Sequence, residues 1–405
     1  MNVKFLFLLA LSATIILFSS CAESDSDLKS DVKEFVAHQL KIAVNEAETR
    51  IDEQLENNVE QQTLRISPRS VSEEGELNLV PSRDWTSGFF PGNLWFMHEW
   101  TGDDYWLEKA KYFTSFIEQE KYNDRTHDMG FKIYCSFGNG YRLTDDPHYR
   151  DVMIQSANTL ITRFNETVGS LRSWDHNRDK WDFPVIIDNM MNLELLFWAT
   201  RATGDSVYYD IAVSHADLTL REHFRHDASS YHVIDFNPET GEVQARNTHQ
   251  GYAHESAWAR GQAWGLYGFV MSYRETGIKE YLDKAIRIAD FVFNHPNLPE
   301  DMVPYWDFNA PGIPDVPRDV SAATIIASAL YELSTMGTEK SSFYKETADK
   351  IIDSVEAYYT SPEGENFGFI LTDSTGHLPH GYERAVPIIY ADYYYLEALL
   401  RRKNL

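Results

Sequence analysis

The feature that most constrains the fold is a helical apolar period that continues through nearly the whole chain after residue 28. Apolar residues recur at i, i+3, i+4 and i+7, and short stretches with Gly, Asp or Pro separate the periodic segments. This pattern predicts helices at residues 28–57, 87–101, 104–121, 128–142, 148–164, 185–202, 206–224, 257–276, 279–294, 319–336, 341–359 and 385–403. Only residues 230–236 and 366–372 could form short hairpin strands.

A turn motif recurs between these helices and indicates that they are paired. Its first copy is Trp100-Thr101-Gly102-Asp103-Asp104-Tyr105, and related copies begin near Leu143, Ala202, Glu275 and Met336. The Gly can end one helix in the left-handed conformation, and the polar residues after it can start the next helix. Helix pairs at this spacing need neighbours to bury their apolar faces. Six pairs that close on themselves predict an all-α, single-domain (α/α)6 toroid, and an open helical solenoid is the alternative.

The N-terminal segment has the pattern of an export signal. Lys4 precedes an almost unbroken apolar run that ends at Ser19, Ser20 and Cys21. Cys21 is placed like the lipidated cysteine of a bacterial lipoprotein, which predicts a signal peptide at residues 1–20, a polar tether at 21–31 and the toroid domain at 32–405. The expected location is the periplasm or outer membrane of a Gram-negative bacterium, with a lipid anchor as the membrane contact. The other cysteine, Cys135, is then left without a disulfide partner.

Charge and motifs exclude several classes of function. The 36 Lys and Arg residues are outnumbered by 62 Asp and Glu, and the net charge of −26 excludes nucleic acid as a partner. The sequence lacks a His-Glu-x-x-His motif, a Cys cluster, a P-loop and a serine-nucleophile elbow. We therefore expect no metal and no cofactor. Aromatic residues make up 14% of the chain, a proportion that suits stacking against flat ligands such as sugar rings.

Two acidic residues stand where the helical pattern calls for apolar side chains. Asp188 lies within the apolar segment Val185–Leu193, and Asp128 follows His127 at the start of another predicted helix. A carboxyl group in apolar surroundings keeps its proton to higher pH, which suits a general acid. Either residue alone could instead be an N-terminal helix cap. Two such acids beside irregular loops favour a paired-carboxylate site.

A third cluster joins His249–Tyr252 to Trp258–Gly265. Arg260 and Trp264 are four residues apart and therefore share one helix face. An Arg beside an indole suits the binding of a carboxylate and a sugar ring, although packing of the Arg stem on Trp is the structural alternative. Other long connections carry Trp85, Trp174 and His232, which could recognise a ligand or anchor their loops.

Three motifs together resemble the unsaturated glucuronyl hydrolases, family 88 of the glycoside hydrolases. They are His127–Gly130, Ile186–Asn192, and Gln250–Tyr252 followed by Trp258–Gly265, and the resemblance covers most of residues 30–403 in the same order. It implies the (α/α)6 toroid and an exo-acting enzyme that removes a Δ4,5-unsaturated uronic acid from the non-reducing end of lyase products. Glycosaminoglycan-type disaccharides are the expected substrates. Ala391 departs from the Gly-Asp-Tyr run expected near the C-terminus.

Carried over residue by residue, the resemblance implies that Asp188 is the general acid and base and that Asp128, beside His127, is the second essential acid. The implied sugar-binding positions are Trp174, His232, Gln250, Trp258, Arg260, Trp264, Thr248 and Trp85. In the implied chemistry Asp188 protonates C4 of the substrate, and its carboxylate then takes a proton from the water that attacks C5. An unsaturated rhamnogalacturonyl hydrolase of the same fold and a non-catalytic, lipid-anchored glycan-binding protein are the alternatives. The second would not need Asp128 and Asp188.

Overall fold

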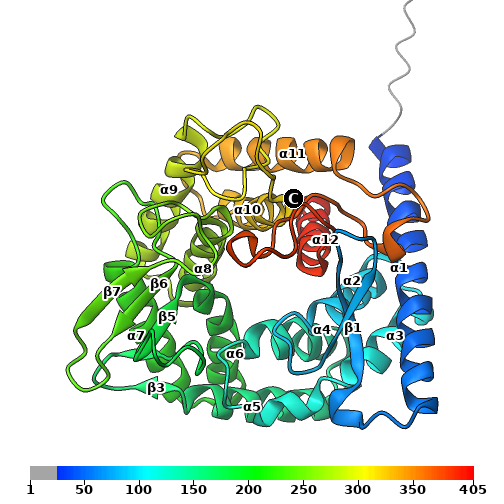
Figure 1. Ribbon diagram of the computed structural model, residues 1–405, viewed down its shortest axis with the longest axis horizontal. Coiled ribbons are helices and arrows are strands. Elements are labelled where there is room, and N and C mark those ends of the chain that lie inside the picture. Colours follow the sequence, from blue (N-terminus) through cyan, green and yellow to red (C-terminus); the bar gives the residue numbers. More distant parts are fainter. Residues whose placement is uncertain (1–24) are drawn as a thin grey trace, which may run out of the picture.

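The computed structural model describes residues 25–405 and arranges their helices in two concentric rings (Figure 1). The inner ring consists of α2 (Phe89–Thr101), α4 (Asn139–Thr144), α6 (Leu193–Thr203), α8 (Ala259–Thr276), α10 (Val320–Ser334) and α12 (Ile389–Lys403). The outer ring consists of α1 (Asp25–Glu56), α3 (Asp104–Ser115), α5 (Pro147–Ile161), α7 (Val207–Glu222), α9 (Lys279–Asn294) and α11 (Ser341–Tyr358). The last inner helix, α12, packs against the first, α2, and closes the ring. The fold is the predicted (α/α)6 toroid.

The recurring turn motif joins each inner helix to the next outer one. Gly102, Gly204 and Gly277 end α2, α6 and α8 with φ of 70°, 75° and 70°, a conformation that glycine adopts without steric cost. Asp103 then caps α3 by accepting a hydrogen bond from the backbone N–H of Tyr105. Because these short turns all lie at the C-terminal ends of inner helices, the inner helices are parallel. Their N-terminal ends, which follow the long connections, meet at the other mouth of the toroid.

The two predicted helices that carry the candidate acids are partly wrong. The segment predicted as a helix at 128–142 is a π-helix, η3 (Gly130–Gly138), followed by α4. The segment predicted at 185–202 begins as strand β5 (Phe183–Ile186), continues as the 3-10 helix η4 (Ile187–Asn192) and becomes α-helical only in α6. Val185 and Ile186 are β-branched and fully or almost fully buried, so they pack as readily in a strand as in a helix.

Small antiparallel sheets lie at the mouth of the toroid where the inner helices begin. Strand β5 pairs with β6 (Val233–Phe236), which pairs with β7 (Val243–Asn247), so the hairpin strand expected at 230–236 is confirmed. The segment 366–372 instead holds the 3-10 turn η5 (Asn366–Gly368) and one isolated bridge from Thr360 to Leu371. The pattern also missed two hairpins, β1 (Arg65–Val71) with β2 (Leu77–Pro81), and β3 (Phe164–Asn165) with β4 (Ser170–Leu171). The remaining 3-10 segments are η1 (Gln61–Thr63), η2 (Glu118–Tyr122) and η6 (Leu378–His380).

The predicted signal peptide lies outside the described residues, whereas the later part of the expected tether belongs to α1, which begins at Asp25. Within residues 25–405, no helix has both the length and the hydropathy required to span a bilayer. Cys135 is buried with a free thiol.

Gly92 allows α2 to approach its neighbours closely. A Cβ atom there would lie 2.4 Å from the Tyr393 ring and 2.8 Å from the carbonyl oxygen of Cys135. Gly92→Ala should therefore lower the free energy of unfolding by about 1–3 kcal/mol through overpacking. The control is Gly265→Ala in α8, where the nearest atom is on the Phe224 ring at 3.1 Å. Urea denaturation should show the larger loss for Gly92→Ala, and equal losses would contradict this account of the packing.

Candidate active site

The toroid has a cavity at each mouth, and the two differ in chemistry. At the mouth formed by the N-terminal ends of the inner helices, a cavity of about 220 Å³ is lined by three of the predicted sugar-binding residues, Trp85, Trp174 and Gln250. The positive ends of the inner helix dipoles surround this mouth, which favours an anionic ligand. We therefore place the candidate active site at this mouth.

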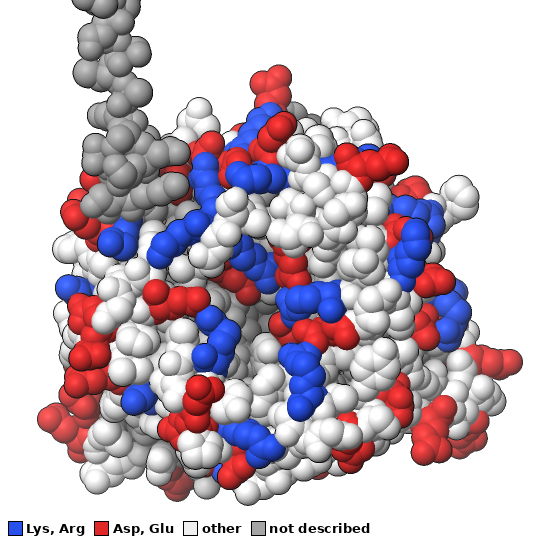
Figure 2. All heavy atoms as spheres, turned by 180° about the vertical axis from the view of Figure 1, so that it is seen from behind, with Lys and Arg blue, Asp and Glu red and all other residues white. Residues whose placement is uncertain are grey.

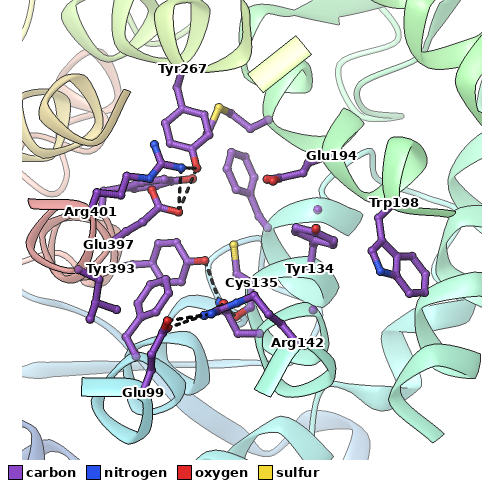
Figure 3. A pocket seen from close by; sticks show the side chains of 18 of the residues that line it. Glu99, Tyr134, Cys135, Arg142, Glu194, Trp198, Tyr267, Tyr393, Glu397 and Arg401 are labelled. Carbon is purple, nitrogen blue, oxygen red and sulfur yellow. Dashed lines mark hydrogen bonds and ion pairs between the residues drawn. The ribbon is translucent and has the colours of Figure 1, made fainter. Parts of the chain in front are cut away.

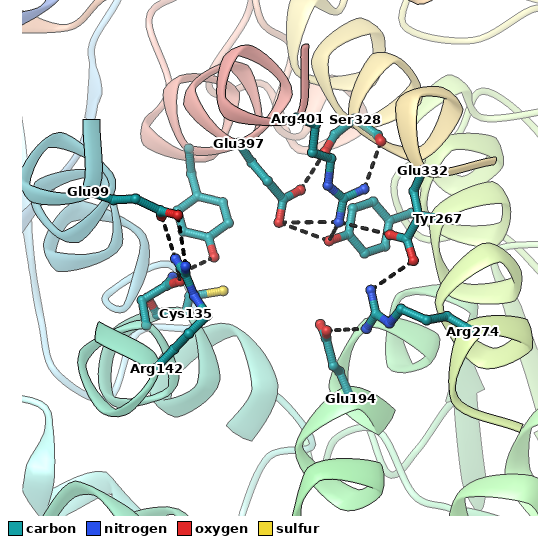
Figure 4. Close-up of polar contacts among 12 residues, drawn as sticks. Glu99, Cys135, Arg142, Glu194, Tyr267, Arg274, Ser328, Glu332, Glu397 and Arg401 are labelled. Carbon is teal, nitrogen blue, oxygen red and sulfur yellow. Dashed lines mark hydrogen bonds and ion pairs between the residues drawn. The ribbon is translucent and has the colours of Figure 1, made fainter. Parts of the chain in front are cut away.

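The opposite mouth holds a larger cavity, of about 500 Å³, on the face seen in Figure 2. Acidic and basic side chains alternate around its central hollow, and Figure 3 shows those that line it. Figure 4 shows that they bind one another and the neighbouring Arg274 and Glu332: Arg142 pairs with Glu99, Arg274 bridges Glu194 and Glu332, and Arg401 pairs with Glu332 and Glu397. None of the predicted site residues lines this cavity. The charged side chains of this larger cavity already neutralise one another, so they are not available to bind a charged ligand. We therefore do not assign the active site to it.

Asp188 lies in the short 3-10 helix η4, between strand β5 and helix α6, and is 7% exposed. The pKa of Asp188 is raised to about 7: burial raises it most, the charge of Arg260 partly offsets this effect, and the charge of Asp128 adds a smaller increase. Among the described residues, its Oδ2 atom has no hydrogen-bond partner. A carboxyl group that titrates near neutrality can both give and take a proton under working conditions.

Asp128 is held by its immediate neighbours. Its Oδ2 atom accepts a hydrogen bond from the Thr126 hydroxyl, and its Oδ1 atom lies 3.2 Å from Nε2 of His127. His127 is buried, and burial lowers its pKa, which favours the neutral imidazole. Thr126 also forms a β-bridge with Trp174, which places the loop of this indole beside Asp128.

The segments that carry the two acids pack backbone against backbone. A Cβ atom on Gly130 would lie 2.6 Å from Cα of Asn192, so only glycine permits this approach. The backbone N–H of Phe131 donates a hydrogen bond to Oδ1 of Asn192 at 3.2 Å. The π-helix and η4 thus hold Asp128 and Asp188 at the same mouth of the toroid, as the paired-carboxylate hypothesis requires.

His232 has a defined orientation towards Asp188. Its Nδ1 atom accepts hydrogen bonds from the backbone N–H groups of His249 and Gln250, both at 3.1 Å, so its proton resides on Nε2. Nε2 lies 3.7 Å from Oδ2 of Asp188. The same turn is shaped by Thr248, whose hydroxyl oxygen accepts a hydrogen bond from the backbone N–H of Gly251 at 2.8 Å. Thr248 therefore supports the turn that carries Gln250.

Arg260 is 1% exposed and binds protein groups. It forms an ion pair with Asp319 at 2.7 Å, and it donates hydrogen bonds to the carbonyl oxygens of Thr375 and Gly376, both at 2.6 Å. Gln250 donates to the same Gly376 oxygen at 3.2 Å. Arg260 thus anchors the loop that forms one wall of the cavity, while its predicted contact with a substrate carboxylate stays a prediction.

The four predicted tryptophans occupy two kinds of position. Trp85 and Trp174 line the cavity, where Trp85 packs on Tyr390 with ring centroids 5.1 Å apart. Trp258 and Trp264 are buried beneath the cavity. Trp258 lies between Arg260 and the His232 ring. Trp264 packs against aromatic side chains of η3 and α12. The buried pair supports the site from below, and its predicted contact with sugar stays a prediction.

Sequence reasoning missed several residues that line this cavity. They are Arg69, His176, His377, Tyr382, Glu383 and Tyr390. Arg69 forms ion pairs with Asp84 at 2.9 Å and with Glu383 at 2.6 Å, and so ties strand β1 to the loop before α12. The sequence indicates Arg69 only by its place in the long connection 58–86. Its partner Glu383 is distant in the sequence, so no local motif joins the two residues.

A buried carboxyl group that titrates near neutrality, a second carboxylate and a cavity walled by indoles together define a carbohydrate-active hydrolase. Residues 57–400 match Glycosyl Hydrolase Family 88, and the chain belongs to this family. It is 54% identical over 341 residues to an unsaturated glucuronyl hydrolase of Formosa agariphila, with 84% of this chain and 85% of the relative covered. A similar enzyme of Bacillus sp. GL1 is 36% identical over 80% of this chain and 87% of its own. A solved unsaturated glucuronyl hydrolase specific for heparin superimposes with a TM-score of 0.84 at 44% identity, covering 92% and 97% of the two chains.

Proposed function

We propose that this protein removes a Δ4,5-unsaturated uronic acid from the non-reducing end of oligosaccharides that polysaccharide lyases release. The observation that carries the proposal is the burial of Asp188, which brings its pKa to about 7 beside Asp128 at the indole-lined mouth. The family and the names of its relatives support the same activity. Loss of the ultraviolet absorbance of the conjugated double bond tests it directly, because a protein that only binds glycans would leave the absorbance unchanged.

The arrangement suits hydration of the substrate's C4=C5 vinyl ether. Protonated Asp188 gives its proton to C4, which leaves positive charge shared between C5 and the ring oxygen. The Asp188 carboxylate then takes a proton from the water whose oxygen bonds to C5. The resulting hemiketal opens to a ketone at C5 and, at C1, a hemiacetal that expels the remaining sugar. The negative charge of Asp128 stabilises the cationic transition state, and the Nε2–H of His232 faces the Asp188 carboxylate at 3.7 Å.

Glycosaminoglycan-type disaccharides are the proposed substrate class. Relatives at 31–32% identity are named unsaturated chondroitin disaccharide hydrolases. A solved mutant of a Streptococcus agalactiae unsaturated glucuronyl hydrolase, with a TM-score of 0.74, is complexed with dGlcA-GalNAc6S. Comparing kcat/KM on unsaturated chondroitin, heparin and pectin fragments tests this choice. Faster turnover of the pectin fragments would favour the unsaturated rhamnogalacturonyl hydrolase.

The pH dependence should report the protonated form of Asp188. Burial places its pKa at about 7, above the ordinary value of 3.8, so the proton-donating form decreases as pH rises through 7. The rate constant kcat/KM should therefore fall on the basic side with an apparent pKa near 7. Initial rates between pH 5 and 9 at constant ionic strength provide the measurement. A rate that stays level up to pH 9 would contradict the assignment of Asp188 as proton donor.

We infer from the export signal that the mature chain is anchored to the envelope of a Gram-negative bacterium by a lipid on Cys21. The signal and Cys21 lie outside the described residues, so the inference rests on the sequence pattern. In fractionated cells the wild-type protein should sediment with membranes, whereas Cys21→Ser should remain in the soluble fraction. A Cys21→Ser variant that still partitions with membranes would rule out the anchor.

A further inference from the structure

Three histidines gather at the rim of the active-site cavity and have no part in the proposed chemistry. His249 lies in the turn after β7, while His377 and His380 lie around the 3-10 helix η6, far away in the sequence. The rings of His377 and His380 stack at 4.0 Å with an interplanar angle of 9°. His249 faces both edge-on, with ring centroids 4.7 Å away in each case. One nitrogen from each ring lies within 4.8 Å of the others.

The buried member of this cluster, His377, has ring nitrogens that no described residue occupies. His377 is 5% exposed, yet neither Nδ1 nor Nε2 has a hydrogen-bond partner among the described residues. A buried polar atom without a partner is costly and rare in folded proteins, so such a pair of atoms calls for an explanation. Within residues 25–405, no acidic side chain forms an ion pair with any of the three imidazoles, so no carboxylate competes for them.

We propose that His249, His377 and His380 bind one divalent transition-metal ion of the zinc type. Imidazole nitrogens suit zinc, copper and nickel, and three of them leave one position of a tetrahedral zinc ion for water or an anionic group. Zinc–nitrogen bonds of about 2.0–2.1 Å require the three nitrogens to be closer than they are here. Imidazole lone pairs lie in the ring plane, so the stacked rings of His377 and His380 must also turn out of parallel to face one ion. His380 is exposed and His249 half-buried, which leaves their side chains room to turn.

The ion would connect two loops that form the wall of the cavity. The loop of His377 includes Gly376, whose carbonyl oxygen accepts hydrogen bonds from Arg260 and Gln250. Gln250 directly follows His249, so a metal bridge would fix this turn to the loop through a second connection. Linear sequence motifs do not reveal the site, because its three histidines come from distant segments of the chain.

Metal binding can be measured without substrate, so its failure would leave the proposed hydrolase activity standing. Purified full-length protein is treated with a chelator, dialysed and titrated with Zn²⁺ by calorimetry and with Co²⁺ by visible d–d absorption. We expect one ion per chain and a higher Tm with Zn²⁺. His380→Ala, at an exposed position, should fold and weaken Zn²⁺ binding at least about tenfold.

The matched control is His148→Ala, which removes an exposed histidine on the outer helix α5 and should leave the affinity unchanged. His377→Ala should abolish the Co²⁺ spectrum. The absence of stoichiometric binding by the wild-type protein would overturn the proposal. So would a His380→Ala variant that binds Zn²⁺ as tightly as the wild type.

Discussion

Asp188→Asn should lower kcat at least about a hundredfold, because asparagine cannot give a proton to C4 or take one from water. General acid and base catalysis contributes about 10²- to 10⁴-fold to enzymatic rates, which sets this range. The amide nearly matches the carboxyl group in shape, so KM should change far less than kcat. Initial rates of absorbance loss on an unsaturated disaccharide provide the measurement.

The fold of this variant should be intact, and its stability provides the control. In the folded protein the pKa of Asp188 is raised to about 7, so between its unfolded value and pH 7 the folded state binds more protons than the unfolded state. Asp188 therefore destabilises the fold increasingly as pH rises through that range, and Asp188→Asn removes the effect. At pH 8 the variant should melt no lower than the wild type. Near-normal turnover in a folded Asp188→Asn variant would exclude Asp188 as the proton donor.

Arg260→Ala should lower the free energy of unfolding by about 3–5 kcal/mol, because it leaves the fully buried Asp319 without its partner. It also removes the hydrogen bonds to Thr375 and Gly376 that hold the cavity wall. In the folded fraction we expect KM to rise more than kcat falls, because a wall that binds the ligand equally in the ground state and the transition state contributes to KM alone. Urea denaturation and steady-state kinetics measure the two effects.

The matched control is Arg142→Ala at the opposite mouth. Arg142 also pairs with a carboxylate, Glu99, at 2.6 Å, but about half of its side chain is exposed. Water screens such a pair, so the expected loss is about 0–1 kcal/mol. Equal losses of stability in the two variants would show that burial does not strengthen the Arg260–Asp319 pair.

The toroid could be predicted from the sequence because the residues that begin and end each helix lie close together along the chain. The turn around Gly102 combines a helix end, an Asp cap and a Tyr within a few residues, and its repetition predicts paired helices. The strand β5 could not be predicted in the same way. Val185 and Ile186 belong to a short apolar run that suits a buried strand or a buried helix equally, and pairing with β6 decides between them.

The candidate site could be predicted where a charged residue stands in an apolar segment. Asp188 is a carboxylate in an apolar run, and its burial follows from that run. The partners of Arg260 were not predictable, because Asp319 and Gly376 come from other connections that only the closed ring brings together. The histidine cluster is hidden for the same reason, since its ligands share no linear motif.

Solvent deuterium reports whether the enzyme protonates C4 during hydration of the C4=C5 bond. With unsaturated disaccharide in heavy water, the proton that Asp188 delivers to C4 exchanges with solvent before each turnover. Proton NMR of the product at early times should therefore show deuterium at one of the two C4 positions, before slow exchange next to the C5 ketone labels both. Early product with no deuterium at C4, or with equal labelling of both positions, would contradict protonation of C4 by the enzyme.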